Sequence, residues 1–260
     1  MLKKRLIFTL LYNNGEYQLS RNFRLQQVGD LKWLRQNYDF DSIAYSIDEL
    51  VVLNVSREQS CMATFANNLI ELSQHYFLPV TAGGWVRSLE DATLLLRSNA
   101  DKIIINSLLF ENPELVREMS SIFGTQCIVA SIDCRTILGD YRVFTDCGRR
   151  DTGLTPPQAV RYAQDLGVGE VYLTSIDRDG TGFGYDLSLY HSVRNICRVP
   201  VIMSGGVGQS EHLAQGLRLD DITGASTANI FNFMADGLKV ARKYLQDQDI
   251  PMASWEKVTT

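Results

Sequence analysis

Apolar, strand-like runs alternate along the whole chain with segments whose apolar residues recur at helical spacing. The predicted strands are Arg5–Leu11, Glu49–Asn54, Pro79–Ala82, Lys102–Asn106, Gln126–Asp133, Glu170–Ser175, Val199–Ser204 and Ile222–Ala225. The predicted helices are Asp30–Tyr38, Met62–His75, Leu89–Ser98, Pro113–Phe123, Pro156–Leu166, Leu187–Ile196, Ser210–Leu217 and Phe233–Leu245. Eight βα units without a linker between them predict an α/β fold, a (β/α)8 barrel that occupies residues 1–260 as a single domain.

The two halves of the chain resemble each other. Glu49–Leu53 is similar to Glu170–Thr174, and Pro79–Gly84 is similar to Pro200–Gly206, at a spacing of about 121 residues in the first case. This repeat predicts two similar half-barrels, roughly residues 1–123 and 124–248, followed by a C-terminal tail over residues 249–260. Two related halves would place two similar ligand sites across the barrel mouth.

Helix starts carry their own signals. Ser88, Asn112 and Ser210 stand directly before or at the start of helical segments, where a side-chain oxygen can accept hydrogen bonds from unpaired backbone N–H groups. We predict all three as N-caps. A further helix is expected to begin near Asp186.

A polar turn follows the sixth predicted strand. The run Asp177–Gly182 contains two carboxylates, a guanidinium group and two glycines. In α/β folds, ligands bind beyond the carboxyl ends of the strands, which favours chemistry at this turn. A solvated polar loop is the alternative for an isolated motif of this kind.

Two glycine pairs follow strands at equivalent places in the two halves. One site would combine Gly205, Gly206, Ala228 and Asn229, and its counterpart would combine Gly83, Gly84, Asn106 and Ser107. Backbone N–H groups in such loops can hold a phosphate, as they do after the seventh and eighth strands of many barrels. A glycine pair alone is more often a turn, but the repetition in both halves favours phosphate binding.

Charged residues stand at both ends of the predicted strands. Asp133 closes the fifth strand, where a carboxylate is well placed as a general acid or base. The alternative is an ion pair with Arg135. At the opposite ends of the strands lie two cations and two anions: Arg5, Glu49, Lys102 and Glu170. They could form a ring across the barrel bottom, although spacing alone favours ordinary strand ends that meet water.

Composition narrows the class of protein. The net charge of -5 argues against a nucleic-acid partner, and no apolar run reaches the roughly 18 residues of a membrane span. The N-terminal MLKKRLIFTLL lacks a following cleavage site, so it is interpreted as a first strand. Five cysteines without a CxxC pair and three dispersed histidines predict free thiols in the cytoplasm, no metal and no cofactor.

The motifs together are specific enough to identify a family. The chain resembles, over nearly its whole length, the cyclase subunit of imidazole glycerol phosphate synthase. The matching stretches are Met1–Arg5, Phe144-Thr145, Thr152-Gly153, Leu173–Thr181, Gly184–Asp186, Ser204–Gly206 and Glu211-His212. The resemblance implies a barrel of two halves that docks on a glutaminase, receives its ammonia through the barrel and cyclises a ribulosyl aminoimidazole carboxamide ribotide.

Several residues on the chemical side depart from the family pattern. Asp133 matches one of its two catalytic aspartates, but the other falls on Leu11, which cannot transfer a proton. A lysine of the loop after strand one falls on Leu19, an aspartate that ends strand two becomes Asn54, and the third glycine of a phosphate loop becomes Trp85. The indole of Trp85 is expected to crowd a phosphate beside Gly84.

Other positions are retained. The resemblance assigns Arg5, Glu49, Lys102 and Glu170 to a charged ammonia gate, in place of the plainer interpretation above, and directs Asp101 and Gln126 toward the glutaminase. The second phosphate site keeps Asp179, Gly180, Gly205, Gly206 and Ala228, with Asn229 in place of a serine.

This mixture resembles cyclase paralogues associated with surface-polysaccharide biosynthesis. It implies a subunit that conducts ammonia from a glutaminase toward a sugar amidotransferase, with little or no cyclase activity. The alternative is a working cyclase of histidine biosynthesis. A pure binding or scaffold protein is a third possibility, which would make the charged gate incidental.

Overall fold

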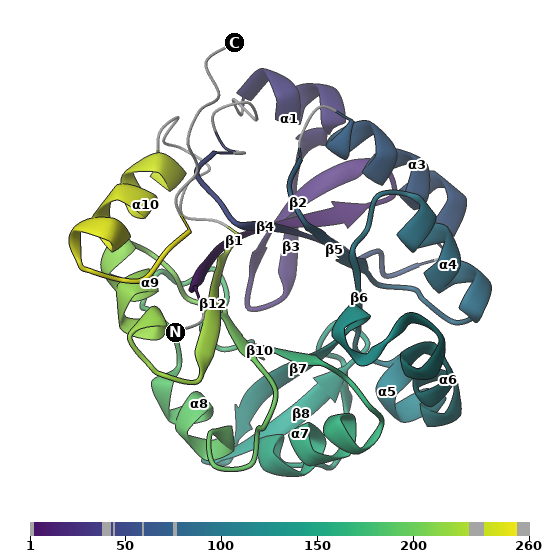
Figure 1. The fold of residues 1–260 in the computed structure, drawn as a ribbon. Coiled ribbons are helices and arrows are strands. Elements are labelled where there is room, and N and C mark those ends of the chain that lie inside the picture. The colour runs from purple at the N-terminus through teal and green to yellow at the C-terminus, as the bar shows by residue number, and fades with distance from the viewer. Residues whose placement is uncertain are drawn as a thin grey trace.

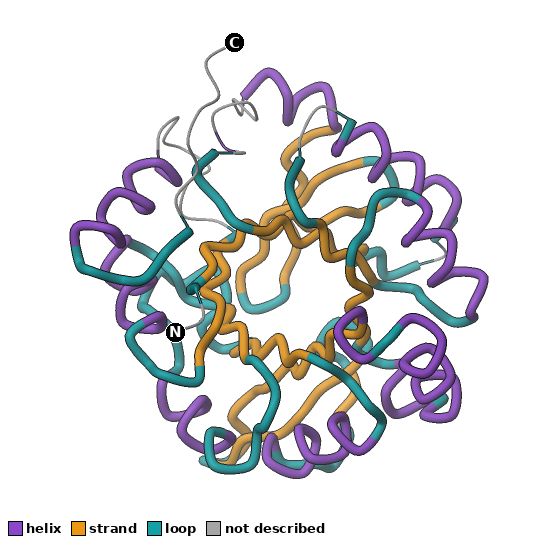
Figure 2. Tube along the Cα trace, in the orientation of Figure 1, coloured by secondary structure: helices purple, strands orange, loops and turns teal. Residues whose placement is uncertain are grey.

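The barrel predicted from the alternating pattern is present. The computed structural model describes residues 3–37, 43, 45–58, 60–74, 77–228 and 237–253. Parallel strands form a closed ring with helices outside it (Figures 1 and 2). The barrel strands are β1 (Arg5–Asn13), β4 (Glu49–Asn54), β5 (Val80–Gly83), β6 (Lys102–Ile105), β7 (Ile128–Ile137), β10 (Glu170–Ser175), β11 (Val201–Ser204) and β12 (Ile222–Thr227).

Closure depends on the pairing of the last barrel strand with the first. Strand β12 runs parallel to β1, with Gly224 opposite Arg5 and Thr227 opposite Phe8. Strand β6 pairs in parallel with β7, which joins the two halves of the ring at their other seam. Strand β10 pairs in parallel with both β7 and β11. No barrel strand therefore has a free edge among the residues that the structure describes.

Nine helices are described around the ring. They are α1 (Leu31–Asn37), α3 (Met62–Ser73), α4 (Leu89–Arg97), α5 (Leu108–Glu111), α6 (Pro113–Phe123), α7 (Pro156–Asp165), α8 (Leu187–Val193), α9 (Ser210–Leu217) and α10 (Gly237–Asp247). The main core lies between these helices and the outer faces of the strands. A second, smaller cluster of apolar side chains fills the interior of the ring.

The predicted ends of the elements mostly agree with the observed ones. Proline explains two shifts, because Pro79 and Pro200 lack the N–H that a strand needs and β5 and β11 begin directly after them. The prediction of Phe233–Leu245 for the last helix is shifted, since α10 covers Gly237–Asp247 and residues 233–236 lie outside the described part. The short helices α5 and η1 (Thr125–Cys127) were not predicted.

Two of the three predicted N-caps are confirmed. The Ser88 hydroxyl accepts a hydrogen bond from the Asp91 N–H in a capping box, and the Asn112 side chain accepts one from the Leu115 N–H. Ser210 is wrong by one position, because Gln209 is the N-cap of α9 and makes no side-chain cap. Asp186 caps α8 through the Leu189 N–H.

Two β-hairpins extend the barrel and were not predicted as strands. Strands β2 (Glu16–Arg21) and β3 (Arg24–Asp30) continue from β1, while β8 (Asp140–Thr145) and the short β9 (Arg150–Asp151) continue from β7. Asn14-Gly15 forms the two-residue turn between β1 and β2 with positive φ at both residues. Asn-Gly is a strong hairpin signal, so this turn was visible in the sequence.

A buried ion pair fastens the last helix to the barrel. Arg242 on α10 makes two hydrogen bonds to Asp48, each 3.0 Å long, and Asp48 also accepts a hydrogen bond from the Leu6 N–H. Their side chains are only 8% and 5% exposed. Because Leu6 belongs to β1 and Asp48 directly precedes β4, the pair connects α10 to the place where the ring closes.

Replacing Arg242 by methionine is expected to lower the free energy of unfolding by about 3–5 kcal/mol, because Asp48 would remain buried without its cation. Urea unfolding followed by circular dichroism measures the loss. The matched control is Arg117→Met, since the ion pair of Arg117 with Glu114 is exposed and should contribute less than about 1 kcal/mol. Equal effects of the two substitutions would contradict the assigned role of Arg242.

Candidate functional site in the barrel interior

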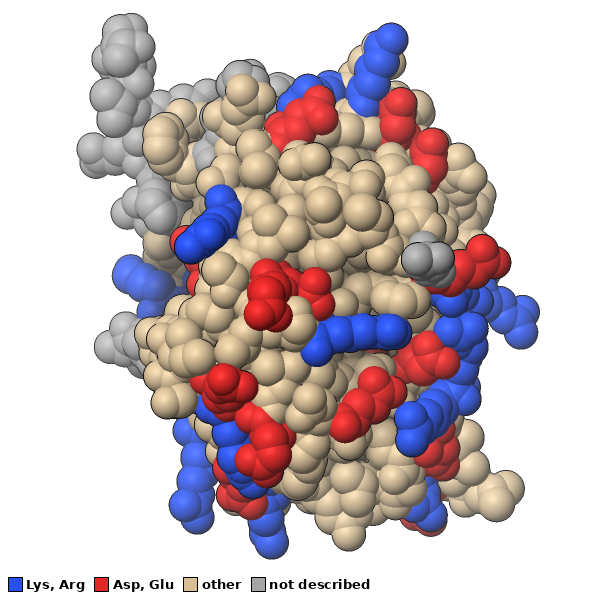
Figure 3. Space-filling view, turned by 90° about the vertical axis from the view of Figure 1, so that its right-hand side faces the viewer, with Lys and Arg blue, Asp and Glu red and all other residues tan. Residues whose placement is uncertain are grey.

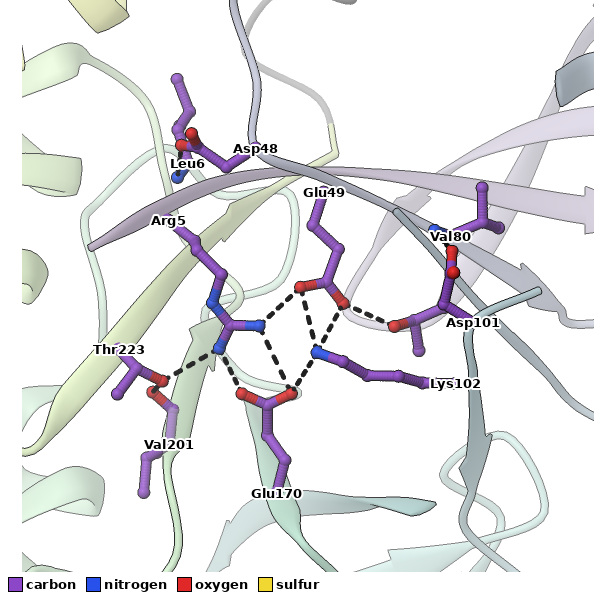
Figure 4. Close-up of polar contacts among 11 residues, drawn as sticks. Arg5, Leu6, Asp48, Glu49, Val80, Asp101, Lys102, Glu170, Val201 and Thr223 are labelled. Atoms are coloured by element: carbon purple, nitrogen blue, oxygen red, sulfur yellow. Dashed lines mark hydrogen bonds and ion pairs between the residues drawn. The ribbon is translucent and has the colours of Figure 1, made fainter. Parts of the chain in front are cut away.

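Four charged side chains close the N-terminal end of the barrel (Figure 4). Arg5 from β1, Glu49 from β4, Lys102 from β6 and Glu170 from β10 each stand at the first residue of a strand. Since strand residues alternate in direction and the first residue of each strand points inward here, the four groups meet on the barrel axis. Positive and negative charges alternate around the ring.

The ring is held by ion pairs between every neighbouring couple. Arg5 contacts Glu49 at 2.5 Å and also pairs with Glu170. Lys102 Nζ lies 3.3 Å from Glu49 and 2.9 Å from Glu170. The interpretation of these residues as strand ends that merely meet water is wrong, because the two glutamates are only 2% and 6% exposed.

The ring also favours the ionised form of Glu170. Burial favours a higher pKa for Glu170, but Arg5 and Lys102 outweigh it and lower the pKa of this carboxyl below its ordinary value. Thr81 donates a hydrogen bond of 2.5 Å to Glu49, and Thr223 accepts one of 3.0 Å from Arg5. The four charges therefore form a neutral, hydrogen-bonded plug.

An apolar layer lies above the ring inside the barrel. It contains side chains from six strands, all at most 2% exposed: Ile7, Val51, Ile104, Val129, Tyr172 and Ile202. These residues stand two positions beyond ring residues on β1, β4, β6 and β10, so they form the next inward layer. A molecule that passed along the axis would cross this layer before reaching the mouth.

A cavity of about 280 Å³ occupies the C-terminal mouth. It brings together many of the predicted site residues, which come from both halves of the chain. The predicted residues that line it are Leu11, Asn54, Gly84, Trp85, Asn106, Ser107, Asp133, Asp179 and Ala228. The order along the barrel axis is therefore ring, apolar layer and mouth cavity.

Asp133 is the acidic group at the floor of this cavity. Burial is the main cause that raises its pKa, to about 7, while a hydrogen bond from Ser131 opposes the rise and the negative charge of Asp179 adds to it. The Ser131 hydroxyl lies 2.9 Å from Asp133. A carboxyl that titrates near neutral pH can give or take a proton at little cost, as a general acid or base must. Leu11 lines the same cavity and supplies no second proton-transfer group.

Asp179 fastens the β2–β3 hairpin across the mouth. Its carboxylate accepts hydrogen bonds from the Ser20 hydroxyl and, at 3.0 Å, from the Phe23 N–H. Asn22 adds hydrogen bonds from its side chain and its backbone N–H to carbonyl oxygens of the segment that ends at Asp179. Gly180 is required here, because a Cβ at this residue would stand 2.1 Å from the Ser20 carbonyl oxygen. Sequence reasoning missed Ser20 and Phe23, for which the Asn14-Gly15 turn was the available signal.

Trp85 forms part of the cavity wall beside Gly84. Its indole N–H donates a hydrogen bond of 2.7 Å to the Ser56 carbonyl oxygen, and the Arg87 guanidinium lies 4.5 Å from the ring centre. Its backbone has φ 63°, the left-handed conformation that favours glycine. The side chain therefore occupies a loop that has kept a glycine-like backbone. Asn54, at the end of β4, uses its side chain to hold Ser56 and Ser60 in the same wall.

The remaining predicted site residues are distributed more widely. Gly205 and Gly206 both have positive φ and pack against the backbone of Ser175 and Gly184, so they do not line the cavity. Asn229 lies outside the described residues. Leu19 is partly exposed on β2 and is absent from the cavity wall. Phosphate binding at either glycine pair stays a prediction.

Asp101 and Gln126 lie at the same end of the barrel as the ring. Asp101 directly precedes β6 and accepts a hydrogen bond of 2.7 Å from the Val80 N–H, while Gln126 is exposed just before β7. Each therefore stands on the surface around the ring, at the end of the barrel opposite to the mouth cavity.

The described residues give no support for a metal site, a disulfide or a membrane-spanning helix. No group of three or more His, Cys, Asp or Glu side chains there is placed to hold a metal ion, and the five cysteines are unpaired. None of the helices described is long and apolar enough to cross a membrane. The face over α3 to α6 carries acidic and basic side chains interspersed among neutral ones (Figure 3).

Replacing Lys102 by methionine is expected to destabilise the fold by about 2–4 kcal/mol at neutral pH, because two buried glutamates would share one cation. The loss should shrink in acid: Glu170 has a lowered pKa in the folded state, so the stability from the ring is full above the ordinary carboxyl pKa and disappears as pH falls through the lowered one. Urea unfolding at several pH values tests this, with the exposed pair of Arg35 as control (Arg35→Met). A loss that does not depend on pH would contradict it.

Replacing Asp133 by asparagine should stabilise the protein above pH 7. The folded state keeps a proton up to about pH 7 that the unfolded chain releases near 3.8, so rising pH destabilises the wild type across this window. The asparagine variant escapes that loss, with a gain on the order of 2–4 kcal/mol above pH 7 that fades toward pH 4. Asp140→Asn on the exposed hairpin is the control. Parallel pH curves for wild type and Asp133→Asn would refute the assignment.

Comparison with known proteins agrees with this geometry. Residues 35–235 match the family described as "Histidine biosynthesis protein". The chain is similar to a protein of Parasynechococcus marenigrum (strain WH8102) named "Putative imidazole glycerol phosphate synthase subunit hisF2". The two are 41% identical over 256 residues, which cover 98% of this chain and 95% of that protein. The chain therefore belongs to the histidine biosynthesis family, as a divergent relative of the cyclase subunit of imidazole glycerol phosphate synthase.

Proposed function

We propose that this barrel pairs with a glutaminase subunit, conducts ammonia along its axis and serves the amidination of a sugar in surface-polysaccharide biosynthesis, with reduced or no cyclase activity. The observation that carries the proposal is the contrast between the two ends of the barrel. The ion-pair ring is complete at one end, whereas the mouth has one of the two expected acid–base groups.

The ring supports delivery rather than reaction. Its four charges are neutralised by one another, and the groups that line the axis above them are apolar. An uncharged molecule can enter such a passage with little desolvation, whereas a free ion would lose its hydration without a partner. Ammonia is small and neutral, so it is the form of reduced nitrogen that suits this interior. A glutaminase docked around Asp101 and Gln126 would release it beside the ring.

The mouth supports a changed reaction. Cyclisation in this family is expected to use two proton-transfer groups, and losing one such group typically lowers a rate about 10²–10⁴-fold. Leu11 stands in the cavity in place of the second. Trp85 adds an indole at a loop position where a glycine would leave room for an anion. A large phosphorylated substrate is therefore a poor fit at the Gly84 side.

Asp133 retains a proton-transfer role under this proposal. Its pKa near neutrality allows it to hold a proton next to arriving ammonia, or to remove one from an ammonia-derived group. The downstream partner would be a sugar amidotransferase that takes ammonia from the mouth. A phosphorylated small molecule bound near Gly205 and Gly206 is the ligand that the second glycine pair predicts.

The alternative is an active cyclase that makes imidazole glycerol phosphate and aminoimidazole carboxamide ribotide in histidine biosynthesis. The family membership and the placement of Asp133 and Asp179 in one cavity favour it. Gene context separates the two: a neighbouring sugar amidotransferase gene supports the first function, and neighbouring histidine-pathway genes support the second.

The deciding experiment measures two activities of the purified chain. With the ribulosyl ribotide substrate and excess ammonium salt, we expect turnover at least about 10²-fold below that of a cyclase with both aspartates. With the glutaminase encoded in the same genome, we expect co-elution on size exclusion and faster glutamine hydrolysis. Leu11→Asp should raise cyclase turnover, whereas the matched Leu11→Asn, which adds no carboxylate, should not.

Two results would overturn the proposal. Ordinary cyclase turnover by the wild type would show that Leu11 is tolerated and that the mouth still performs the family reaction. Failure to bind or stimulate the glutaminase would remove the source of ammonia on which the delivery role depends.

A further inference from the structure

Four hydroxyl groups gather inside the barrel between the apolar layer and the mouth. Thr9 of β1 lies 2.9 Å from the Tyr172 hydroxyl of β10 and 2.7 Å from the Ser226 hydroxyl of β12. The Tyr172 and Ser226 hydroxyls are 2.7 Å apart, and Ser204 of β11 lies beside the Tyr172 hydroxyl, whose pKa it tends to lower. We call these four residues the hydroxyl cluster. Neither the charged ring nor the predicted acid–base chemistry uses it.

The cluster lies on the path between the two ends of the barrel. Glu170, Tyr172 and Thr174 are alternate residues of β10, so their side chains face the interior in succession. Glu170 belongs to the ring, and Thr174 hydrogen-bonds Asp133 at the mouth. The Tyr172 ring packs in the apolar layer, and Thr9, Tyr172 and Ser204 line the floor of the mouth cavity. The cluster is thus the first polar group above the apolar layer.

The hydroxyl cluster has more hydrogen-bond acceptor sites than donor protons. Three hydrogen bonds join Thr9, Tyr172 and Ser226 in a triangle, so the three protons of these hydroxyls can all be used within it, and Ser204 lies beside Tyr172. Oxygen lone pairs are then left over, since a hydroxyl offers one donor and two acceptor sites. Tyr172 shares in three of the contacts, so the spare acceptors belong to the serine and threonine oxygens. A guest that donates hydrogen bonds to these oxygens leaves the internal bonds intact, whereas a guest that only accepts would have to break one of them.

This imbalance selects a guest that donates hydrogen bonds. Ammonia carries three N–H donors and one lone pair, while water carries two donors and two lone pairs. The surroundings are almost completely buried, with Thr9 4% and Ser226 1% exposed, so a permanent positive charge would be poorly solvated there. Neutral ammonia meets both conditions.

We propose that the hydroxyl cluster is an ammonia-binding station at the inner end of the mouth cavity, where ammonia that has crossed the apolar layer is held below Asp133. The proposal rests on the ammonia-conducting function proposed above. It assigns Thr9, Tyr172, Ser204 and Ser226 a binding role, with Thr9 and Ser204 supplying free acceptors toward the cavity.

The test follows Tyr172 directly by nuclear magnetic resonance, without a glutaminase. The chain is labelled with ¹³C at the phenolic carbon of tyrosine, and the Tyr172 signal is the one lost in Tyr172→Phe among the 11 tyrosines. Ammonium chloride is added at alkaline pH, where much of it is neutral ammonia, and potassium chloride serves as the salt control. We expect a saturable shift of the Tyr172 signal with ammonium chloride alone.

Variants separate binding from a purely structural role. Thr9→Val keeps the shape of the side chain but removes one acceptor, and it should weaken the ammonia dependence at least several-fold while the remaining tyrosine signals stay in place. Tyr190→Phe is the matched control. It removes a buried tyrosine hydroxyl on α8, outside the barrel strands, that donates a hydrogen bond to Asp221, so it should leave the Tyr172 shift unchanged.

Three results would overturn the station. They are no shift of Tyr172 at any ammonium concentration, an equal shift in mildly acidic solution where only the cation is present, and an ammonia dependence that Thr9→Val leaves intact. A failure here, in a chain that still stimulates the glutaminase, would reject the station and leave the delivery function standing. If the chain binds ammonia but does not stimulate the glutaminase, the station is supported and the delivery function is rejected.

Discussion

The closure of the ring of strands is the constraint on which the remaining structure depends. Because β12 pairs with β1, the inward side chains of eight strands share one narrow interior, and each layer has to be filled by the same few positions. A substitution on one strand therefore alters the packing of side chains from strands that are distant in the sequence. Arg5 and Glu170 are 165 residues apart, yet they form one ion pair on the axis.

This shared interior explains how the two ends of the barrel can differ so much in chemistry. On β1 the ring, the apolar layer and the hydroxyl cluster are successive levels at Arg5, Ile7 and Thr9, each two residues beyond the last. Tyr172 of β10 packs in the apolar layer and extends its hydroxyl into the cluster. The levels are also different in polarity: paired charge, then hydrocarbon, then hydroxyl, then the isolated carboxyl of Asp133. The proposed ammonia station depends on this order of levels, because a small neutral molecule can cross the hydrocarbon level and then donate hydrogen bonds to the hydroxyls.

Much of the architecture could be predicted from the sequence because the signals were local. Runs such as Ile103–Ile105 placed the barrel strands to within a few residues, whereas the predicted strands that included Pro79 and Pro200 began one or two residues before β5 and β11. The β2–β3 hairpin was missed because β3 is mostly exposed and lacks an apolar face, so its alternation is weak. The contact of Ser20 with Asp179 joins residues 159 apart, and no local pattern encodes it. The hydroxyl cluster was invisible for the same reason, since Thr9, Tyr172 and Ser226 are unremarkable on their own strands.

The conformation of Trp85 links backbone strain in its loop to the shape of the mouth cavity. A bulky residue in the left-handed region costs on the order of 1–2 kcal/mol relative to glycine. A glycine at this position would relax the backbone but would remove the indole from the cavity wall. The Trp85 indole offsets part of this strain, because it donates a hydrogen bond to the Ser56 carbonyl oxygen and is covered by Arg87. The side chain and the backbone of this loop are therefore under opposite demands, and the width of the cavity beside Gly84 is set by the side chain.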